Sequence, residues 1–328
     1  MNTSIQSLFN IGRNIPWDEF RQPSMRSMAI EMQVRLCDLG LLDPIVDGNV
    51  INPFRPVAKA DGIVGLNTRN ALFEFSRMAG VKYHDTYVSF DQIRRLSSTN
   101  PMSFLPVMAQ NAQGDTTATR FAKRVLRYLS RKGYWIGRSP NMYNIVYVEG
   151  VNADGRPNAD RFNEWNDRRL VIRINQPSGR PELLVNDQAT TEPGDYYTRY
   201  PLNPNGAARI AFGQYKAWKT GLHSGWQPAL VQRGNVKLHR DKNKNGFRDS
   251  ADPIDIGDAF GINHHSTQPN FSSPTIGRYS AGCLVGMRYE WHLKFLEVVK
   301  RDVRYQRNNN YLFMTAVIAG DDLAKLEP

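Results

Sequence analysis

The spacing of apolar residues changes its period along this chain of 328 residues, and that change limits the folds open to it. Met28, Met32, Leu36 and Leu39 follow a helical period, and this run ends at Gly40. Beyond residue 140 the apolar residues form short runs rich in Val, Ile, Leu and Tyr, separated by Gly, Pro and Asn. The pattern therefore predicts a multidomain α+β fold, in which a small helical part precedes a mainly β part.

A second helical run follows a turn at 61–65, where an aspartate and two glycines favour a tight reversal. Asn67 or Thr68 is expected to cap this helix. Its apolar residues include Ala71, Leu72 and Phe75. In the second part, strands are predicted at 144–148, 170–174, 182–185 and 311–318. One more helix is predicted near 289–303, with an apolar face of Trp291, Phe295, Val298 and Val299.

The polar stretch 97–119 predicts a linker between the parts, so the expected organisation is a helical domain at 1–96 and a second domain at 120–328. The N-terminus has no basic start followed by an apolar core, and no apolar run reaches membrane-spanning length. No signal peptide and no membrane insertion are expected. Two cysteines allow at most one disulfide, and Cys37, on the first helix, is interpreted as a packing residue.

A cluster of cations opens the second domain, and the formal net charge of the chain is +11. The cations alternate at helical spacing with Phe121, Val125 and Leu129, which predicts that they line the solvated face of an amphipathic helix. They are Arg120, Lys123, Arg124, Arg127, Arg131 and Lys132. An anionic partner is favoured, and nucleic acid and the bacterial cell wall both qualify. No zinc-finger spacing, RNA-binding aromatic motif or phosphate loop is found, so nucleic acid is not expected.

The first domain resembles the small helical peptidoglycan-binding domain found beside many cell-wall enzymes. The resemblance covers about residues 20–85 and rests on the segments 33–36, 39–42, 61–65 and 71–75 with Thr68-Arg69. It implies bacterial peptidoglycan as the partner. An insertion at about 43–60 departs from the family, where a short link is usual, and bears on the glycan groove.

The segment Ser280-Ala281-Gly282-Cys283 carries a thiol, and His265-Ser266 lies eighteen residues upstream of it. A free thiol is mostly protonated near neutral pH, and an imidazole can remove its proton to create a nucleophile. Gly282 permits close approach of a substrate, and its amide or that of Cys283 is suited to binding an oxyanion. A buried cysteine with no chemistry is the alternative.

The two segments together resemble the signature of the L,D-transpeptidase catalytic domain, over about residues 120–320. That family acylates a cysteine with a peptidoglycan stem peptide and passes the acyl group to an amine or to water. The resemblance implies Cys283 as nucleophile, His265 as base and Ser266 as the neighbour whose backbone orients the imidazole. Ser280 and Gly282 match the positions that shape the oxyanion site. His264 competes for the role of base, and the sequence leaves that choice open.

Two departures from this family stand next to the nucleophile. Ala281 replaces the histidine usual after the serine, and Val285 stands where arginine or asparagine often follows. They bear on substrate choice and on the outcome of the reaction. The segment 191–197 resembles the substrate-side turn of the family. Residues offered for the substrate groove are Tyr215, Trp218 and His223.

The segment 241–252 resembles an EF-hand-type calcium loop. Its candidate Ca²⁺ ligands, which include the backbone carbonyl of the phenylalanine, are Asp241, Asn243, Asn245, Phe247, Asp249 and Asp252. Gly246 supplies the sharp turn, and Pro253 argues against an exiting helix. We expect a structural Ca²⁺ that braces the active-site loop, with a metal-free Asx turn as the alternative.

These features predict a cysteine enzyme that modifies peptidoglycan through an acyl-enzyme. Absence of a signal peptide makes a hydrolase released by phage lysis, or delivered by a phage or injection-system particle, an alternative form of that function. It also predicts synthesis in the cytoplasm and action at the cell wall, by lysis, particle delivery or a non-classical route. The alternative from another class is a non-catalytic wall-binding or virion structural protein.

Overall fold

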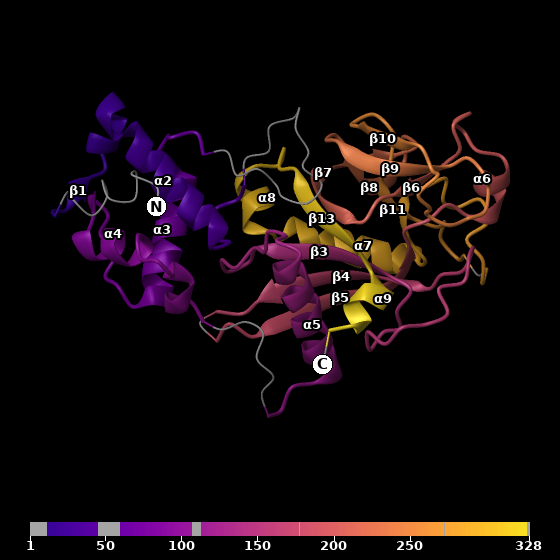
Figure 1. Ribbon diagram of the computed structural model, residues 1–328, viewed down its shortest axis with the longest axis horizontal. Helices are drawn as coiled ribbons and strands as arrows, with labels where there is room; N and C mark the ends of the chain where they lie inside the picture. The colour runs from indigo at the N-terminus through magenta and orange to yellow at the C-terminus, as the bar shows by residue number, and fades with distance from the viewer. Residues whose placement is uncertain (1–11, 45–59, 107–112, 177, 272, 327–328) are drawn as a thin grey trace.

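The computed structural model describes residues 12–44, 60–106, 113–176, 178–271 and 273–326. Figure 1 shows a helical first part beside a larger, sheet-rich second part. The first part contains β1 (Ile15–Pro16), 3₁₀ turns at Glu19–Arg21, Pro23–Met25 and Pro101–Phe104, α2 (Arg26–Asp38), α3 (Leu66–Ala79), β2 (Tyr87–Val88) and α4 (Phe90–Leu96). A mixed fold with a large sheet and several helices, compatible with the α+β class, is therefore what the chain forms.

The helical part is organised around one apolar core and one buried glutamine. Leu36 of α2 and Phe75 of α3 are fully buried in that core, as the helical spacing predicts. Gln33 of α2 donates to Asp61 Oδ1 at 2.7 Å and to Thr68 Oγ1 at 3.2 Å, and its Oε1 accepts from the Gly62 amide at 2.8 Å. The 61–65 turn is thus fastened to α2.

One expectation about a helix end in this part was wrong, and one helix was missed. Neither Asn67 nor Thr68 caps α3, because the helix begins at Leu66 and its N-cap is Gly65, without a side-chain bond. The helix α4 was not predicted, although Ser89 and Gln92 form a capping box at its start. Part of the expected linker also belongs to this unit, since Leu105 is buried in its core. Linker residues 107–112 lie outside the described residues.

The second part is built on a closed sheet of eight strands in the order β11-β12-β5-β4-β3-β13-β7-β8, with a smaller sheet β10-β9-β6 beside it. The strands are β3 (Tyr143–Glu149), β4 (Asp167–Ile174), β5 (Pro181–Thr190), β6 (Ala207–Ile210), β7 (Gly213–His223), β8 (Gln227–Gln232), β9 (Val236–Asp241), β10 (Ile254–Gly257), β11 (His264–Ser266), β12 (Leu284–Gly286) and β13 (Phe313–Ala319). The helices are α5 (Thr117–Arg131), α6 (Asp195–Arg199), α7 (Tyr289–Lys300), α8 (Val303–Arg307) and α9 (Gly320–Ala324).

Alternating side chains of the closed sheet enter two different cores. Ile145 and Tyr147 of β3 join a core that includes Phe295 of α7, whereas Val146 and Val148 join a core with Phe121 and Val125 of α5. The period of two is that of a strand buried on both faces. Helix α5 crosses the outside of β3, β4 and β5 (Figure 1).

The predicted strands and helices of this part are present, with two corrections to their faces. Lys123 is not on the solvated face of α5, because it is buried and its Nζ lies 2.6 Å from Asp115 Oδ2. In α7, Trp291 is exposed and does not belong to the buried face predicted for it. The neighbouring His292 is fully buried instead. The strands β6 to β12 were missed, because several of them are only three or four residues long.

The two parts meet at Asp43, a carboxylate of the first part surrounded by groups of the second. It accepts from Arg304 Nη1 at 2.9 Å and from Tyr311 Oη at 3.2 Å, and it pairs with Lys216. Burial opposes ionisation, yet the cations of Lys216 and Arg304 hold the pKa of Asp43 below its usual value. Trp135 Nε1 also donates to the carbonyl of Cys37 at 2.9 Å. The junction is therefore polar, specific and desolvated.

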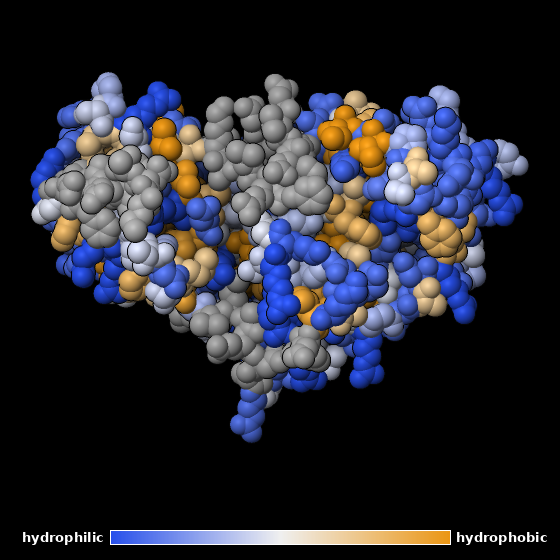
Figure 2. All heavy atoms as spheres, viewed as in Figure 1, coloured by the Kyte–Doolittle hydropathy of each residue, from blue (hydrophilic) through white to orange (hydrophobic). Residues whose placement is uncertain are grey.

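The face of the molecule seen in Figure 2 is largely hydrophilic, with apolar side chains gathered over β10. Ile254 and Ile256 of that strand are exposed. Among the described residues, no helix is both long enough and apolar enough to cross a membrane.

Replacing Asp43 with Asn is expected to destabilise the protein by about 3 kcal/mol, because it leaves two buried cations without their shared counterion. Thermal melting checks this, and a fall in Tm of about 5 °C or more is expected. The control is Asp91→Asn, which removes an ion pair with Arg94 whose side chains are 63% and 56% exposed. Equal Tm values for the two variants would contradict a stabilising junction.

Candidate active site

Cys283 ends a tight turn that only glycine allows at the preceding position. Gly282 has φ +120°, and a Cβ there would lie 2.3 Å from the Ala208 carbonyl oxygen of β6. Ser280 Oγ accepts from the Gly282 amide at 3.1 Å and donates to the Cys283 carbonyl at 3.0 Å. Ser280 and Gly282 thus shape the turn that carries the thiol. Since the Gly282 amide is occupied, the Cys283 amide is the better candidate of the two for binding an oxyanion.

The parallel pairing of β11 with β12 brings Cys283 and His265 to one face of the sheet. His265 is in register with Val285, and His264 with Leu284. Residues in register share a face and successive residues alternate, so Cys283 lies on the face of Val285 and His265. Cys283 and Val285 pack in one apolar cluster with Trp165. Cys283 and His265, eighteen residues apart in the sequence, therefore lie diagonally across two neighbouring strands on one face of the sheet.

His264 lies on the opposite face of β11, inside the main core. Its ring contacts Tyr147, Trp218 and Phe295, with the Trp218 ring centroid 4.6 Å away. Neither ring nitrogen has a hydrogen-bond partner in the described part of the chain, and burial holds the pKa of His264 well below its usual value. The structure therefore directs only His265, of the two histidines, toward the side of Cys283.

The thiol and the imidazole are both neutral in this environment. Burial raises the pKa of Cys283 to about 11, and burial together with the nearby His223 lowers the pKa of His265 to about 3. Cys283 Sγ donates to the Gly261 carbonyl at 3.3 Å and accepts from the Asn263 amide at 3.5 Å. Neither a stored thiolate nor a stored imidazolium is therefore present, and the thiol hydrogen is bonded to the Gly261 carbonyl.

The backbone of Ser266 determines which nitrogen of His265 can act as a base. His265 Nδ1 lies 2.9 Å from the Ser266 carbonyl oxygen, which can only accept, so Nδ1 carries the hydrogen. Nε2 is then the nitrogen with a free lone pair. Gln227 Nε2 donates to the same carbonyl at 3.2 Å and to Ser266 Oγ at 3.0 Å, which holds this orienting group in place.

The groove residues suggested by the sequence divide into two groups. Tyr215 and Trp218 do not line a groove, because both are fully buried and Trp218 Nε1 donates to the Ile262 carbonyl at 2.7 Å. His223 does reach the site, where its ring stacks on that of His265. Trp226, in the turn after His223, is 53% exposed. The β7–β8 hairpin therefore supplies a histidine and an apolar tip beside the histidine of β11.

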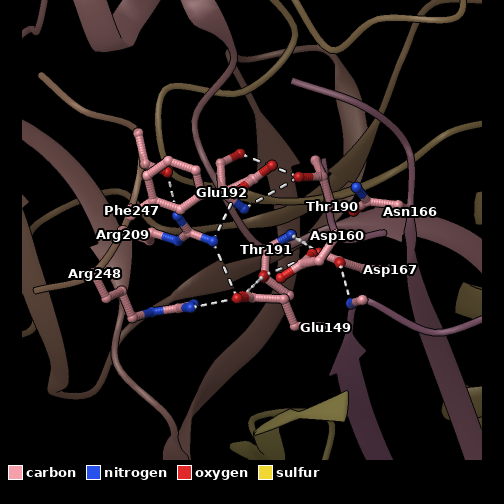
Figure 3. A network of polar contacts seen from close by, with 12 residues as sticks. Glu149, Asp160, Asn166, Asp167, Thr190, Thr191, Glu192, Arg209, Phe247 and Arg248 are labelled. Carbon is pink, nitrogen blue, oxygen red and sulfur yellow. Dashed lines mark hydrogen bonds and ion pairs between the residues drawn. The ribbon is translucent and has the colours of Figure 1, made fainter. Parts of the chain in front are cut away.

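A buried charge network flanks the nucleophile turn, and its members were not found from the sequence (Figure 3). Arg209 of β6 lies 2.7 Å from Glu192 and 3.0 Å from Glu149, and Arg248 lies 2.6 Å from Glu149. Although burial opposes ionisation, Arg248 and Arg209 lower the pKa of Glu149 to about 2. The pKa of Asp167 shifts in the opposite direction. Burial and the carboxylates of Glu149 and Glu192 raise it well above its usual value.

This network touches the segments on either side of Cys283. The turn after β5 was expected on the substrate side, and its Gly194 amide donates to the Ser280 carbonyl at 2.9 Å. Arg209 follows Ala208, whose carbonyl oxygen lies against Gly282. Glu192 and Arg209 therefore sit two residues and one residue, respectively, from the contacts that hold the nucleophile turn. No short sequence motif could have identified Glu192 and Arg209, because their contacts join segments that are distant in the sequence.

The segment 241–252 folds into a tight loop closed by Asx-type hydrogen bonds. Asp241, the last residue of β9, accepts from the amides of Asn245 at 3.1 Å and Gly246 at 2.8 Å. Lys244 and Gly246 have φ of +61° and +80°, and the glycine stands where a calcium loop requires a sharp turn. The strand β10 follows Pro253, so no exiting helix is formed, as expected.

The side chains of this loop converge on Asp249. Asn243 and Asn245 each donate from an amide nitrogen to Asp249 Oδ2 at 2.9 Å. Their Oδ1 atoms accept from the amides of Asn245 and Phe247. Asp252 Oδ2 accepts from the Asp249 amide at 3.1 Å. No three His, Cys, Asp or Glu side chains of the described ranges form a metal-binding group. The donor set fits a hard cation that takes carboxylate and amide oxygens.

The loop is joined to the charge network directly. Arg209 donates to the Gly246 carbonyl, and Arg248 Nε donates to the Ile210 carbonyl at 2.8 Å. Phe247 has a 55% exposed ring, so its predicted contribution remains that of its backbone carbonyl. The loop, β6 and the nucleophile turn therefore form a continuous set of contacts.

Two cavities lie away from the thiol. One of about 890 Å³ is at the junction of the two parts, where Asp43, Lys216 and Arg304 contribute to its wall. Another of about 320 Å³ lies among the loops around Asp160 and Trp165. Cys283 lines neither of them, so neither identifies the position of a substrate on the thiol.

No family model, no curated protein and no solved structure matches this chain.

Proposed function

We propose that the chain is a peptidoglycan-modifying cysteine enzyme of the L,D-transpeptidase type, which acts on stem peptides through an acyl-enzyme. The observation that supports this most is the common face of Cys283 and His265, with the Ser266 carbonyl holding Nδ1 of the imidazole. The net charge of +11 favours approach to an anionic cell envelope. The helical domain, with its resemblance to peptidoglycan-binding domains, holds the enzyme on the wall.

The chemistry follows from the protonation states of the pair. His265 Nε2 takes the proton from Cys283 Sγ as the sulfur attacks the carbonyl carbon of the stem peptide. The Cys283 amide donates to the oxyanion, and the protonated His265 then gives its proton to the departing amine. An incoming amine or water loses a proton to the same imidazole, attacks the thioester and releases Cys283. An amine acceptor gives a cross-link, and water gives hydrolysis.

Ca²⁺ belongs to this proposal as a structural ion. Asp241, Asn243, Asn245, Asp249, Asp252 and the Phe247 carbonyl would hold it. When bound, it would neutralise the carboxylates of the loop. The loop in turn accepts from Arg209 and, through its own Arg248, pairs with Glu149, so its order bears on the turn that carries Cys283.

The decisive test incubates the full chain with purified peptidoglycan and identifies products by mass spectrometry. We expect muropeptides with altered stem peptides, and loss of these products by about a thousandfold or more in Cys283→Ala. Adding a free D-amino acid separates exchange from hydrolysis. The matched control is Cys37→Ala, which removes the other free cysteine and should leave the products unchanged. If Cys283→Ala and wild type gave the same products, the proposed enzyme activity would be contradicted and the non-catalytic alternative would remain.

Removal of calcium should lower stability and activity together. A site occupied at about a hundredfold excess over its Kd contributes roughly 2.7 kcal/mol, which corresponds to about 5 to 10 °C in Tm. Melting in chelator, with calcium or magnesium added back, measures this. Asp241→Ala should melt at the chelator value and ignore calcium, whereas the nearby Asp255→Ala should respond as wild type does. Unchanged melting of wild type in chelator would contradict a calcium site.

A further inference from the structure

The ring of His223 lies flat against the ring of His265. Their centroids are 3.9 Å apart and their planes differ by 4°. His223 is the last residue of β7 and His265 lies on β11, with β8 between these strands in the closed sheet. Two histidines far apart in the sequence therefore form a stacked pair next to the thiol.

The hydrogen bonds of Asn263 determine the protonation state of His223. Asn263 Oδ1 accepts from the Gln232 amide at 2.9 Å, so its Nδ2 is the atom that faces His223 Nδ1 at 3.1 Å. Because Nδ2 can only donate, His223 Nδ1 accepts and the ring hydrogen is on Nε2. If His223 were protonated, its Nδ1–H would face the NH₂ group of Asn263, and two donors would oppose each other. Burial also lowers the pKa of His223, in agreement with a neutral ring.

The other ring of the pair has the complementary arrangement. His265 Nδ1 donates to Ser266, which leaves Nε2 to accept a proton. After that transfer the cationic ring faces a neutral ring, which spares it the repulsion by which a charged His223 would lower the pKa of His265. The stack also restricts rotation of the His265 ring about its side-chain bonds.

The remaining titratable groups around His265 do not supply a competing cation. His264 lies on the other face of β11, and His292 of α7 accepts from Arg169 at Nδ1 and donates to the Pro228 carbonyl at Nε2. Both are buried, and burial holds the pKa of each well below its usual value. Cys283 is the proton donor itself. His223 is therefore the group whose charge most directly affects an imidazolium at His265.

We propose that His223, held neutral by Asn263, is a positioning residue for the base His265: it fixes the ring with Nε2 free, and it offers a neutral face to the imidazolium. The proposal rests on the function proposed above. In the step concerned, the S–H bond of Cys283 breaks, the N–H bond at His265 Nε2 forms, and the sulfur lone pair attacks an electrophile. No further reactant is needed.

The test measures the reaction of Cys283 with iodoacetamide as a function of pH, which requires no peptidoglycan. Peptide mass spectrometry separates Cys283 from Cys37. We expect His223→Ala to react about tenfold more slowly than wild type near pH 7. Above about pH 11, where the thiol ionises without help, the two rates should agree within about twofold. His223→Phe, which keeps a flat neutral ring, should restore most of the rate at pH 7.

Three variants separate the possible failures. His265→Ala must lose the same reactivity near pH 7, and if it does not, the Cys283–His265 pair of the proposed function fails. If only His265→Ala loses it and His223→Ala matches wild type, the role of His223 fails alone. A loss in His223→Ala that is equal at all pH values, or that Phe does not restore, also overturns the proposal. His84→Ala, which removes a histidine stacked at 4.2 Å on Tyr87 in the helical part, is the matched control and should leave the rate unchanged.

Discussion

The candidate site depends on the parallel pairing of two three-residue strands, β11 and β12. Parallel strands cannot be joined by a hairpin, so a long connection must leave β11 and return beside it. Here the connection includes Phe271 and Ile276, which pack against Cys283 and Val285. The crossover thus serves two purposes, because it brings the thiol to the face of the sheet that carries the imidazole and also covers it. Without that cover, the pKa of Cys283 would lie closer to that of a free thiol.

The strands themselves are too short to hold this geometry, and polar contacts from other segments do so. The Gly282 backbone lies against Ala208, and the Ser280 carbonyl accepts from Gly194. Behind these contacts, Arg209 and Arg248 bridge carboxylates from β3 and the end of β5 (Figure 3). A buried network of this kind is costly to desolvate and tolerates few alternative arrangements. Its value lies in specifying one position for the turn.

The extent to which the sequence predicted the structure depends on the range of the interactions concerned. The helices α2, α3, α5 and α7 and the strands β3, β4, β5 and β13 follow from local periodicity and were predicted, whereas the eleven-residue strand β7 was missed. His265 and Cys283 were found through a resemblance, but the choice between His264 and His265 needed the register of β11 against β12. Tyr215 and Trp218 were misplaced because aromatic residues favour cores and grooves alike. Arg209 and Glu192 carry no local signal, since Arg209 pairs with Glu192 across a separation of 17 residues and with Glu149 across one of 60.

The aromatic and histidine stacks make the same point about the limits of local patterns. His223 and His292 look equivalent in the sequence, as isolated histidines without metal-ligand spacing. In the fold one stacks on the ring beside the thiol, whereas the other is buried under α7 with both nitrogens bonded. The different surroundings of these two histidines follow from the order of the strands, which no short sequence motif encodes.

The junction at Asp43 restricts how the two parts of the protein can move relative to each other. Three groups of the second part, on β7, α8 and the segment before β13, share one carboxylate of the first, so the two parts cannot turn freely about the chain that joins them. The distance between any ligand bound by the helical part and the sulfur of Cys283 would then be fixed by the protein itself. Lengthening the connecting segment would not extend that distance.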